Sequence, residues 1–128
     1  LTYGINDMAW HSLTTVPAVD VEAFEKAAIK KTQILPAIDG TSFSTSFSHI
    51  FAGGYSAGYY SYKWAEVLEA DAFSLFEEKG IFSKEVAASF RENILSKGNL
   101  EDPAELYRKF RGRNPKPEAL LEKFGMKK

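Results

Sequence analysis

The stretch from His49 to Trp64, with the sequence HIFAGGYSAGYYSYKW, constrains this chain more than any other segment. It holds one of the two histidines, three of the nine glycines and four of the six tyrosines. Paired glycines favour a turn, and the residues after them have helical spacing. If a helix begins near Tyr55, then Tyr55, Tyr59 and Tyr62 lie at i, i+4 and i+7 on one helix face. The stretch therefore predicts a row of phenol hydroxyls beside a glycine turn and an imidazole.

Composition narrows the classes of protein to which the chain can belong. Its 128 residues suit a single domain, and 45% hydrophobic with 26% charged residues is ordinary for a globular protein. Sixteen basic and seventeen acidic residues nearly cancel, so we expect no nucleic-acid partner and no membrane partner. The absence of cysteine removes disulfides, thiol nucleophiles and cysteine-based metal sites. No apolar run reaches the roughly 20 residues that span a bilayer.

Apolar residues recur at helical spacing along most of the chain, and flanking residues mark where helices begin. Residues 1–13 have the pattern of an amphipathic helix. Further helices are expected to begin at caps or at a first-turn proline: Asp20, Ser83, Asp102 and Pro117. The chain is therefore predicted to be mostly α, a single domain (residues 1–128) formed by a bundle of five or six helices.

The longest predicted helix runs from Tyr55 to about Glu78 and stops at Gly80, a favourable C-cap residue. Residues 32–48, which alternate phenylalanine with small polar residues in TSFSTSFSH, predict an extended segment or a short strand before it. Glycine inside a helix costs about 1 kcal/mol relative to alanine. Gly58 therefore suggests close packing against another backbone, which would hold the tyrosine row rigid.

Two hypotheses fit this pattern when it is taken alone. Tyrosines at helical spacing can be an amphipathic core, and the chain would then be a stand-alone helical interaction module without catalysis. Alternatively, several neutral donors around one bend can hold a peptide backbone or stabilise an oxyanion. Such donors cannot activate water, so catalysis would require a second component, a metal. The two histidines lie far apart and no HExxH, GxSxG, P-loop or dinucleotide motif is present.

The run HIFAGGYSAGYYSYKW resembles the C-terminal signature of the zinc oligopeptidases. This is the thimet oligopeptidase and neurolysin family, and the pattern is closest to bacterial peptidyl-dipeptidase (dipeptidyl carboxypeptidase). Four further segments are similar to the same family: DMAWHSL at 7–13, DVEAF at 20–24, ILSKGN-x-ED at 94–102 and LYRKFRGRNPKPEALL at 106–121. The resemblance covers nearly the whole chain, and signals of this length in register are highly specific.

The resemblance implies hydrolysis of short peptides, with release of C-terminal dipeptides in the peptidyl-dipeptidase branch. It implies catalytic roles near the scissile carbonyl, in substrate binding and oxyanion stabilisation, for Tyr55 and Tyr62. It implies substrate binding by four more residues: His49, Gly53, Gly54 and Tyr59. In the family the histidine lines the substrate cleft and the paired glycines form a flexible loop beside the bound peptide.

The chain departs from the family pattern because it contains no HExxH helix. It also begins at Leu1, within a helix-like pattern and without methionine. We therefore expect a C-terminal fragment of a larger peptidase, with zinc bound by the missing N-terminal part of the same polypeptide. The fragment is expected to bind no zinc and to be inactive alone. An apolar face left uncovered would favour self-association, and the family's usual location implies a cytoplasmic protein.

Overall fold

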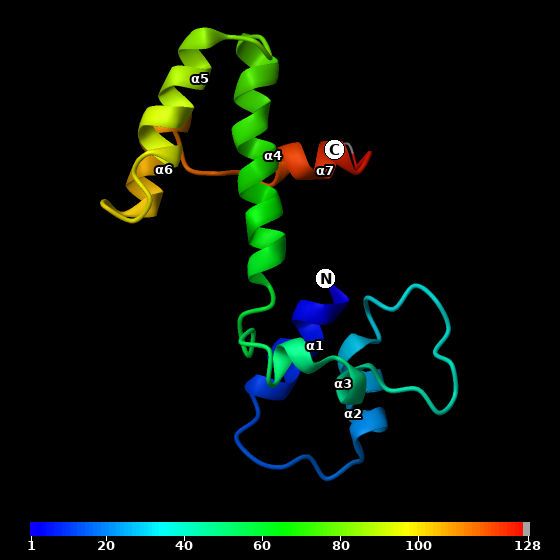
Figure 1. Cartoon of the computed structure of the whole chain (residues 1–128). Coiled ribbons are helices and arrows are strands. Elements are labelled where there is room, and N and C mark those ends of the chain that lie inside the picture. Colours follow the sequence, from blue (N-terminus) through cyan, green and yellow to red (C-terminus); the bar gives the residue numbers. More distant parts are fainter. Residues whose placement is uncertain (127–128) are drawn as a thin grey trace. The chain divides into compact units, whose positions relative to one another are not determined.

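A computed structural model describes residues 1–126, and within them the regular elements are all helical (Figure 1). The prediction of a mostly α chain is confirmed. The described residues form seven α-helices, one 3-10 turn and one π-helical segment. One of the seven, a four-residue helix, was not predicted. The chain divides into two compact units, Leu1–Lys63 and Trp64–Lys128.

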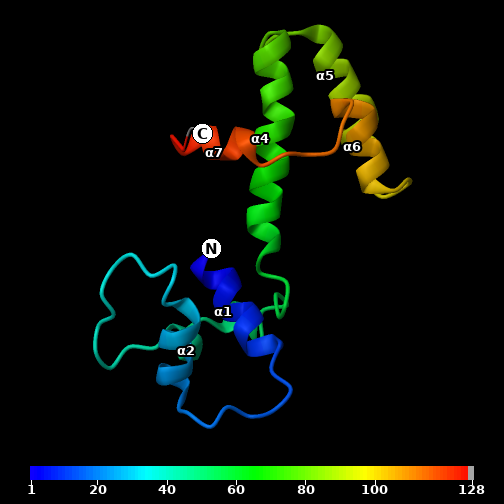
Figure 2. The same cartoon turned by 180° about the vertical axis from the view of Figure 1, so that it is seen from behind.

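The first unit contains three helices and a 3-10 turn: α1 (Thr2–His11), α2 (Val21–Ile29), α3 (Phe43–Ser46) and η1 (Ser48–Ile50). Both views place α2 beside α1 (Figures 1 and 2). The ring of Trp10 on α1 lies 4.2 Å from that of Phe24 on α2, centroid to centroid. The predicted cap at Asp20 is confirmed, because its carboxylate accepts the Ala23 N–H at 2.8 Å.

The prediction of an extended segment or strand over residues 32–48 is wrong for its last part, which forms α3. Two interactions favour this helix. Ser42 caps it by accepting the Thr45 N–H, and the buried Glu25 of α2 accepts the N–H groups of Phe43 and Ser44. First-turn amides have no partner inside a helix, so a carboxylate there stabilises it. The alternation in the sequence is therefore overridden by a side chain on another helix.

Glu25 is buried and holds α3 as an ionised group. Burial alone would raise the pKa of Glu25, but hydrogen bonds from Ser44, Phe43 and Ser42 outweigh burial and keep that pKa below its ordinary value. Ser44 also accepts hydrogen bonds from two α1 side chains, Asn6 Nδ2 at 2.9 Å and Trp10 Nε1 at 2.8 Å. The three helices of this unit are thus joined through polar groups.

The second unit contains the long α4 (Ser61–Lys79) except for its first three residues, which belong to the first unit. It also contains α5 (Lys84–Phe90) with its π-helical continuation η2 (Arg91–Leu95), α6 (Pro103–Arg111) and α7 (Glu118–Lys123). Both views show α5 running back beside α4, and α7 crossing it (Figures 1 and 2). The predicted stop of α4 at Gly80 is confirmed, and that residue has a φ of +103°, which glycine adopts without strain.

A buried ionic cluster joins α4 to the segment after α6. Arg113 donates to both carboxylate oxygens of Asp71, at 2.7 and 3.0 Å, and the Tyr107 hydroxyl donates to the same carboxylate at 2.6 Å. Arg111 donates to the Asp71 carbonyl oxygen at 3.1 Å. The Arg111 side chain is therefore buried, and that of Arg113 is partly buried.

None of the described helices is long and apolar enough to span a membrane.

Candidate functional site

The candidate site lies in the first unit, where residues 51–60 form turns between η1 and α4. The prediction that a helix begins near Tyr55 is wrong, because α4 begins at Ser61. Ala57 has a φ of +55°, which a helix does not allow. The Asp7 carboxylate of α1 accepts the N–H groups of Ala57 and Tyr59, each at 2.9 Å, and so stabilises a turn there.

The paired glycines each have a separate structural requirement. A Cβ on Gly53 would lie 2.6 Å from the Cα of His49, so a larger residue cannot fit there without backbone movement. Gly54 has a φ of +83°, a conformation that favours glycine. The next residue, Tyr55, donates its N–H to the His49 carbonyl oxygen at 3.1 Å. The chain therefore turns back on itself and brings Tyr55 beside His49.

All six predicted site residues lie in this turn or next to it, although not on one helix face. The ring centroid of Tyr62 lies 5.3 Å from that of Tyr55 and 5.0 Å from that of Tyr59. The His49 ring lies 5.7 Å from Tyr55 and 6.5 Å from Tyr59. Gly53 forms the close contact with His49 described above. We call His49, Tyr55, Tyr59 and Tyr62 the tyrosine cluster.

The small-residue argument for Gly58 is wrong. A Cβ there would meet only atoms of its own turn, the nearest being the Tyr55 carbonyl oxygen at 3.6 Å. The close helix packing occurs instead at Gly4 on α1, where a Cβ would lie 3.3 Å from the Tyr60 Cα. The backbone of the turn therefore packs closely against α1.

Sequence reasoning missed three aromatic residues that extend the cluster. Tyr3 on α1 stacks on Phe43 at 4.5 Å and meets Tyr59 edge-on at 5.9 Å. Phe47 contacts both Tyr59 and His49, at 5.2 and 4.9 Å. The alternating phenylalanines of TSFSTSF, which include Phe43 and Phe47, could have indicated such packing. No local pattern in the sequence indicates that Asp7 binds the Ala57 N–H, 50 residues away.

Tyr62 is suited to donate a hydrogen bond from its hydroxyl to a ligand. It is 46% exposed, while Tyr55 and Tyr59 are half-buried. A side-chain hydrogen bond with Tyr55, followed by burial and by the charges of Tyr55 and Tyr59, raises the pKa of Tyr62 above its ordinary 10.0. Its phenol is therefore protonated at neutral pH.

The side chains that commonly bind metals are not gathered at one point within the described residues. Residues 1–126 contain no group of three or more histidine, cysteine, aspartate or glutamate side chains placed to hold a metal ion. These residues do not fit the zinc that the family resemblance implies, so the chemistry below is derived from the tyrosine cluster alone.

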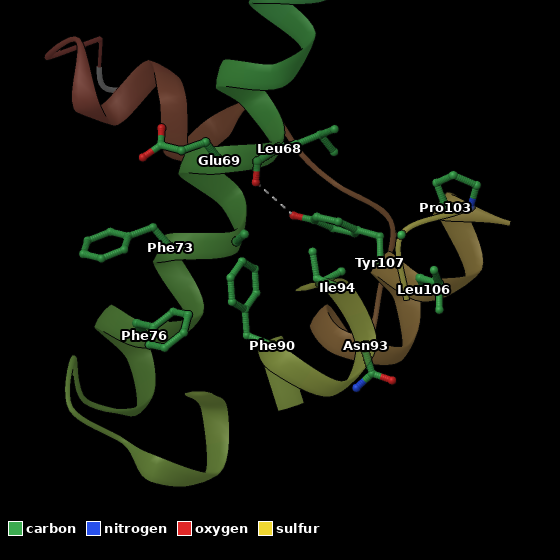
Figure 3. Close-up of a pocket in the computed structure, with 12 residues that line it drawn as sticks. Leu68, Glu69, Phe73, Phe76, Phe90, Asn93, Ile94, Pro103, Leu106 and Tyr107 are labelled. Atoms are coloured by element: carbon green, nitrogen blue, oxygen red, sulfur yellow. Dashed lines mark hydrogen bonds between the residues drawn. The ribbon is translucent and has the colours of Figure 1, made fainter. Parts of the chain in front are cut away.

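A separate cavity of about 490 Å³ lies in the second unit (Figure 3). Figure 3 shows Phe76, Phe90 and Ile94 around it, from α4, α5 and η2. The hydroxyl of Tyr107, its most buried polar group, is already bonded to Asp71. The lining is otherwise mostly apolar, so this cavity suits an apolar side chain better than a reacting group.

Comparison with known proteins decides the family. Residues 1–126 match the sequence profile of peptidase family M3. The chain belongs to peptidase family M3. Among M3 relatives, oligopeptidase A of Escherichia coli (strain K12) is 56% identical over 102 residues, which are 79% of this chain and 15% of that protein.

Two other M3 relatives carry different names. Dipeptidyl carboxypeptidase of Escherichia coli (strain K12) is 43% identical over 128 residues, which cover 98% of this chain and 19% of that protein. Thimet-like oligopeptidase of Dictyostelium discoideum is 36% identical over 87 residues, which cover 68% of this chain and 13% of that protein. The chain thus spans less than a fifth of the length of these relatives.

Proposed function

We propose that this chain forms the substrate-binding and oxyanion-stabilising part of a zinc metallopeptidase that hydrolyses short peptides. The observation that carries the proposal is the tyrosine cluster, in which the rings of Tyr55 and Tyr62, 5.3 Å apart, lie beside an imidazole and a glycine turn in a member of a peptidase family. The names of the relatives, oligopeptidase A and dipeptidyl carboxypeptidase, support a peptide substrate.

In this proposal Tyr55 and Tyr62 act on the scissile carbonyl. As that carbon becomes tetrahedral, negative charge develops on its oxygen, and prepositioned phenol hydroxyls stabilise the charge by donating hydrogen bonds. The contacts of the Tyr62 ring with the rings of Tyr55 and Tyr59 support this assignment, because they limit how far the ring can move. The transition state then meets donors that need no reorganisation.

The remaining members of the site hold the peptide. His49 is exposed at the edge of the cluster, and Tyr59 presents its ring between those of His49 and Tyr62. Gly53 and Gly54 have no side chains, so an extended peptide can approach the backbone there. A peptide lying along this edge would place one carbonyl before Tyr62.

Zinc, which supplies a water nucleophile at neutral pH in such enzymes, is proposed to be bound by the rest of the same polypeptide. The phenols of Tyr55 and Tyr62 only donate hydrogen bonds and cannot generate that nucleophile. The short span of the chain relative to its relatives supports a further part of the polypeptide. Sequencing the gene upstream of the codon for Leu1 tests this directly, since no HExxH segment there would contradict it.

The isolated chain with added zinc and a short peptide is therefore expected to give no hydrolysis. The physical reason is that the described residues present no metal-binding group. Peptide cleavage is measured by mass spectrometry, with the full-length enzyme as the positive control. Turnover by the isolated chain that a chelator abolishes would show that zinc can bind within it, and would overturn this part of the proposal.

The isolated chain is also expected to self-associate. Several large apolar side chains are almost fully exposed, including Phe82 at 96% and Ile34 at 93%, and the apolar cavity of Figure 3 is open to a partner. We propose that the N-terminal part of the peptidase covers such surface. Sedimentation velocity at increasing concentration should show a rising weight-average mass, whereas a monomer at every concentration contradicts the expectation.

We propose a cytoplasmic location for the complete protein. One relative from Arabidopsis thaliana, 53% identical over 100 residues, is named a probable cytosolic oligopeptidase A, which supports this location. Another is named organellar, so fractionation of the source cells is the deciding measurement.

A further inference from the structure

Asp7 on α1 is wholly buried, and its carboxylate binds the turn that links Tyr55 to Tyr62. Its Oδ1 accepts the Ala57 N–H and its Oδ2 accepts the Tyr59 N–H, both at 2.9 Å. Both carboxylate oxygens are therefore used on amides two residues apart in the same turn. A buried carboxylate is costly without such partners, so the arrangement is specific rather than incidental.

His11 completes the environment of this carboxylate. Its Nδ1 lies 2.8 Å from Asp7 Oδ1 and 2.8 Å from the Asp7 carbonyl oxygen, one helical turn away. A ring nitrogen that faces two acceptors carries the hydrogen and donates it. Nδ1–H of His11 thus binds the same carboxylate oxygen as the Ala57 N–H and orients the carboxylate.

The conformation of the turn needs this support. Ala57 has a φ of +55°, a strained conformation for a residue other than glycine, and such strain persists only where surrounding contacts enforce it. Gly4 lies one turn before Asp7 on the same face of α1, and its missing Cβ lets the Tyr60 backbone approach. The face of α1 that carries Gly4, Asp7 and His11 therefore determines where the chain runs between the two tyrosines.

We propose that Asp7 is a positioning residue of the peptidase site. It fixes the turn at Ala57 and Tyr59, and thereby the pairing of Tyr55 with Tyr62, which enter the cluster from the two sides of that turn. His11 orients Asp7 in this role. The proposal rests on the proposed function, because the pairing affects turnover only if the two phenols act on a substrate.

The experiment uses the full-length peptidase and the substitution Asp7→Asn. An asparagine keeps the size of the side chain but turns an NH₂ group toward one of the two amide N–H groups, which it cannot accept. A misplacement of about 1 Å can cost about 10²-fold in rate. We expect kcat for a short peptide to fall by about 10–100-fold, with KM nearly unchanged.

The matched control is Asp20→Asn. Asp20 is exposed and its carboxylate also accepts a backbone amide, that of Ala23, but it lies outside the tyrosine cluster. Asparagine is as good an N-cap as aspartate, so the control is expected to leave kcat unchanged. Melting temperatures of all variants show whether each is folded. If Asp7→Asn does not fold, His11→Gln is measured in its place.

A double-mutant cycle separates positioning from a merely structural role. If Asp7 acts by pairing the two phenols, Asp7→Asn lowers kcat far less in a Tyr62→Phe background than in the wild-type enzyme. An equal factor in both backgrounds, or no effect of Asp7→Asn at all, overturns the proposal and leaves the proposed function standing. If Tyr62→Phe itself leaves kcat unchanged, the proposed function fails instead.

Discussion

Replacing Tyr62 by phenylalanine in the full-length peptidase is expected to lower kcat by about 10²–10³-fold, the scale of one lost oxyanion donor. The substitution keeps the ring and its contacts with Tyr55 and Tyr59, and removes only the hydroxyl. A donor used mainly in the transition state affects kcat rather than KM. Steady-state kinetics on a short peptide measure both constants.

The control for Tyr62→Phe is Tyr60→Phe, in the same segment of chain. Tyr60 is 57% exposed and its ring makes none of the contacts that define the tyrosine cluster. We expect kcat of this variant to equal that of the wild type. A Tyr62→Phe enzyme with wild-type kcat would exclude Tyr62 from oxyanion stabilisation, whatever the control does.

The effect of Tyr62→Phe should also depend on pH in one direction. The hydrogen bond with Tyr55, and then burial and nearby phenols, raise the pKa of Tyr62 above 10.0. The Tyr62 hydroxyl therefore stays protonated at every pH below about 10. The ratio of wild-type to variant kcat should therefore be constant from neutral pH to about 10, and fall only above it. A ratio that declines near pH 8 would contradict the role of the protonated phenol.

The members of the tyrosine cluster were predictable from the sequence, but the geometry that joins them was not. Helical periodicity predicted Tyr55, Tyr59 and Tyr62 on one face, and only Tyr62 lies on a helix. The three rings still meet, because the turn brings their centroids to between 5.0 and 6.1 Å from one another. The decisive contact is that of Asp7 with amides 50 and 52 residues away, and local pattern contains no information on such a pair.

The lack of information on distant contacts in local sequence patterns also explains why α3 was not predicted. Local signals, such as the caps at Asp20 and Asp102, involve residues two or three positions apart and were predicted correctly. The alternation in TSFSTSF was also local, and it favoured a strand. The Glu25 carboxylate, 18 and 19 residues away, supplies partners for first-turn amides and favours a helix instead. A polar side chain from another helix changed the local structure in both segments.

Replacing Asp71 by alanine is expected to lower the free energy of unfolding of the second unit by about 3–5 kcal/mol. Asp71 is 1% exposed and is the common partner of Arg113 and Tyr107. Without it, the half-exposed guanidinium of Arg113 keeps only the Asn114 carbonyl oxygen, and the Tyr107 hydroxyl keeps only the distant Leu68 carbonyl oxygen, 3.5 Å away. A buried group that loses its close, charged acceptor costs more than the bond it made. Hydrogen exchange of the amides of α4 and α6 measures the loss, and their protection should fall by about 100-fold or more.

Asp102→Ala is the matched control, because Asp102 is an exposed aspartate whose carboxylate caps α6. Loss of a cap typically costs about 0.5–2 kcal/mol, which is less than the loss of a buried ion pair. Equal effects of the two substitutions would mean that the buried cluster adds nothing beyond a surface hydrogen bond. The amides of α1 and α2 should keep their protection in both variants, since the cluster lies outside the first unit.

The pH dependence supplies an independent check on the Asp71 cluster. Burial alone would raise the pKa of Asp71, but hydrogen bonds from Arg113 and Tyr107 and the charges of Arg113 and Arg111 hold it below its ordinary 3.8. A lowered folded-state pKa means that this stabilisation is complete above the unfolded pKa and is lost as pH falls through the folded one. The difference in stability between wild type and Asp71→Ala should therefore be constant near neutrality and shrink below about pH 4. A difference that stays constant down to pH 2 would show that the carboxylate charge is not what holds α4 to the segment after α6.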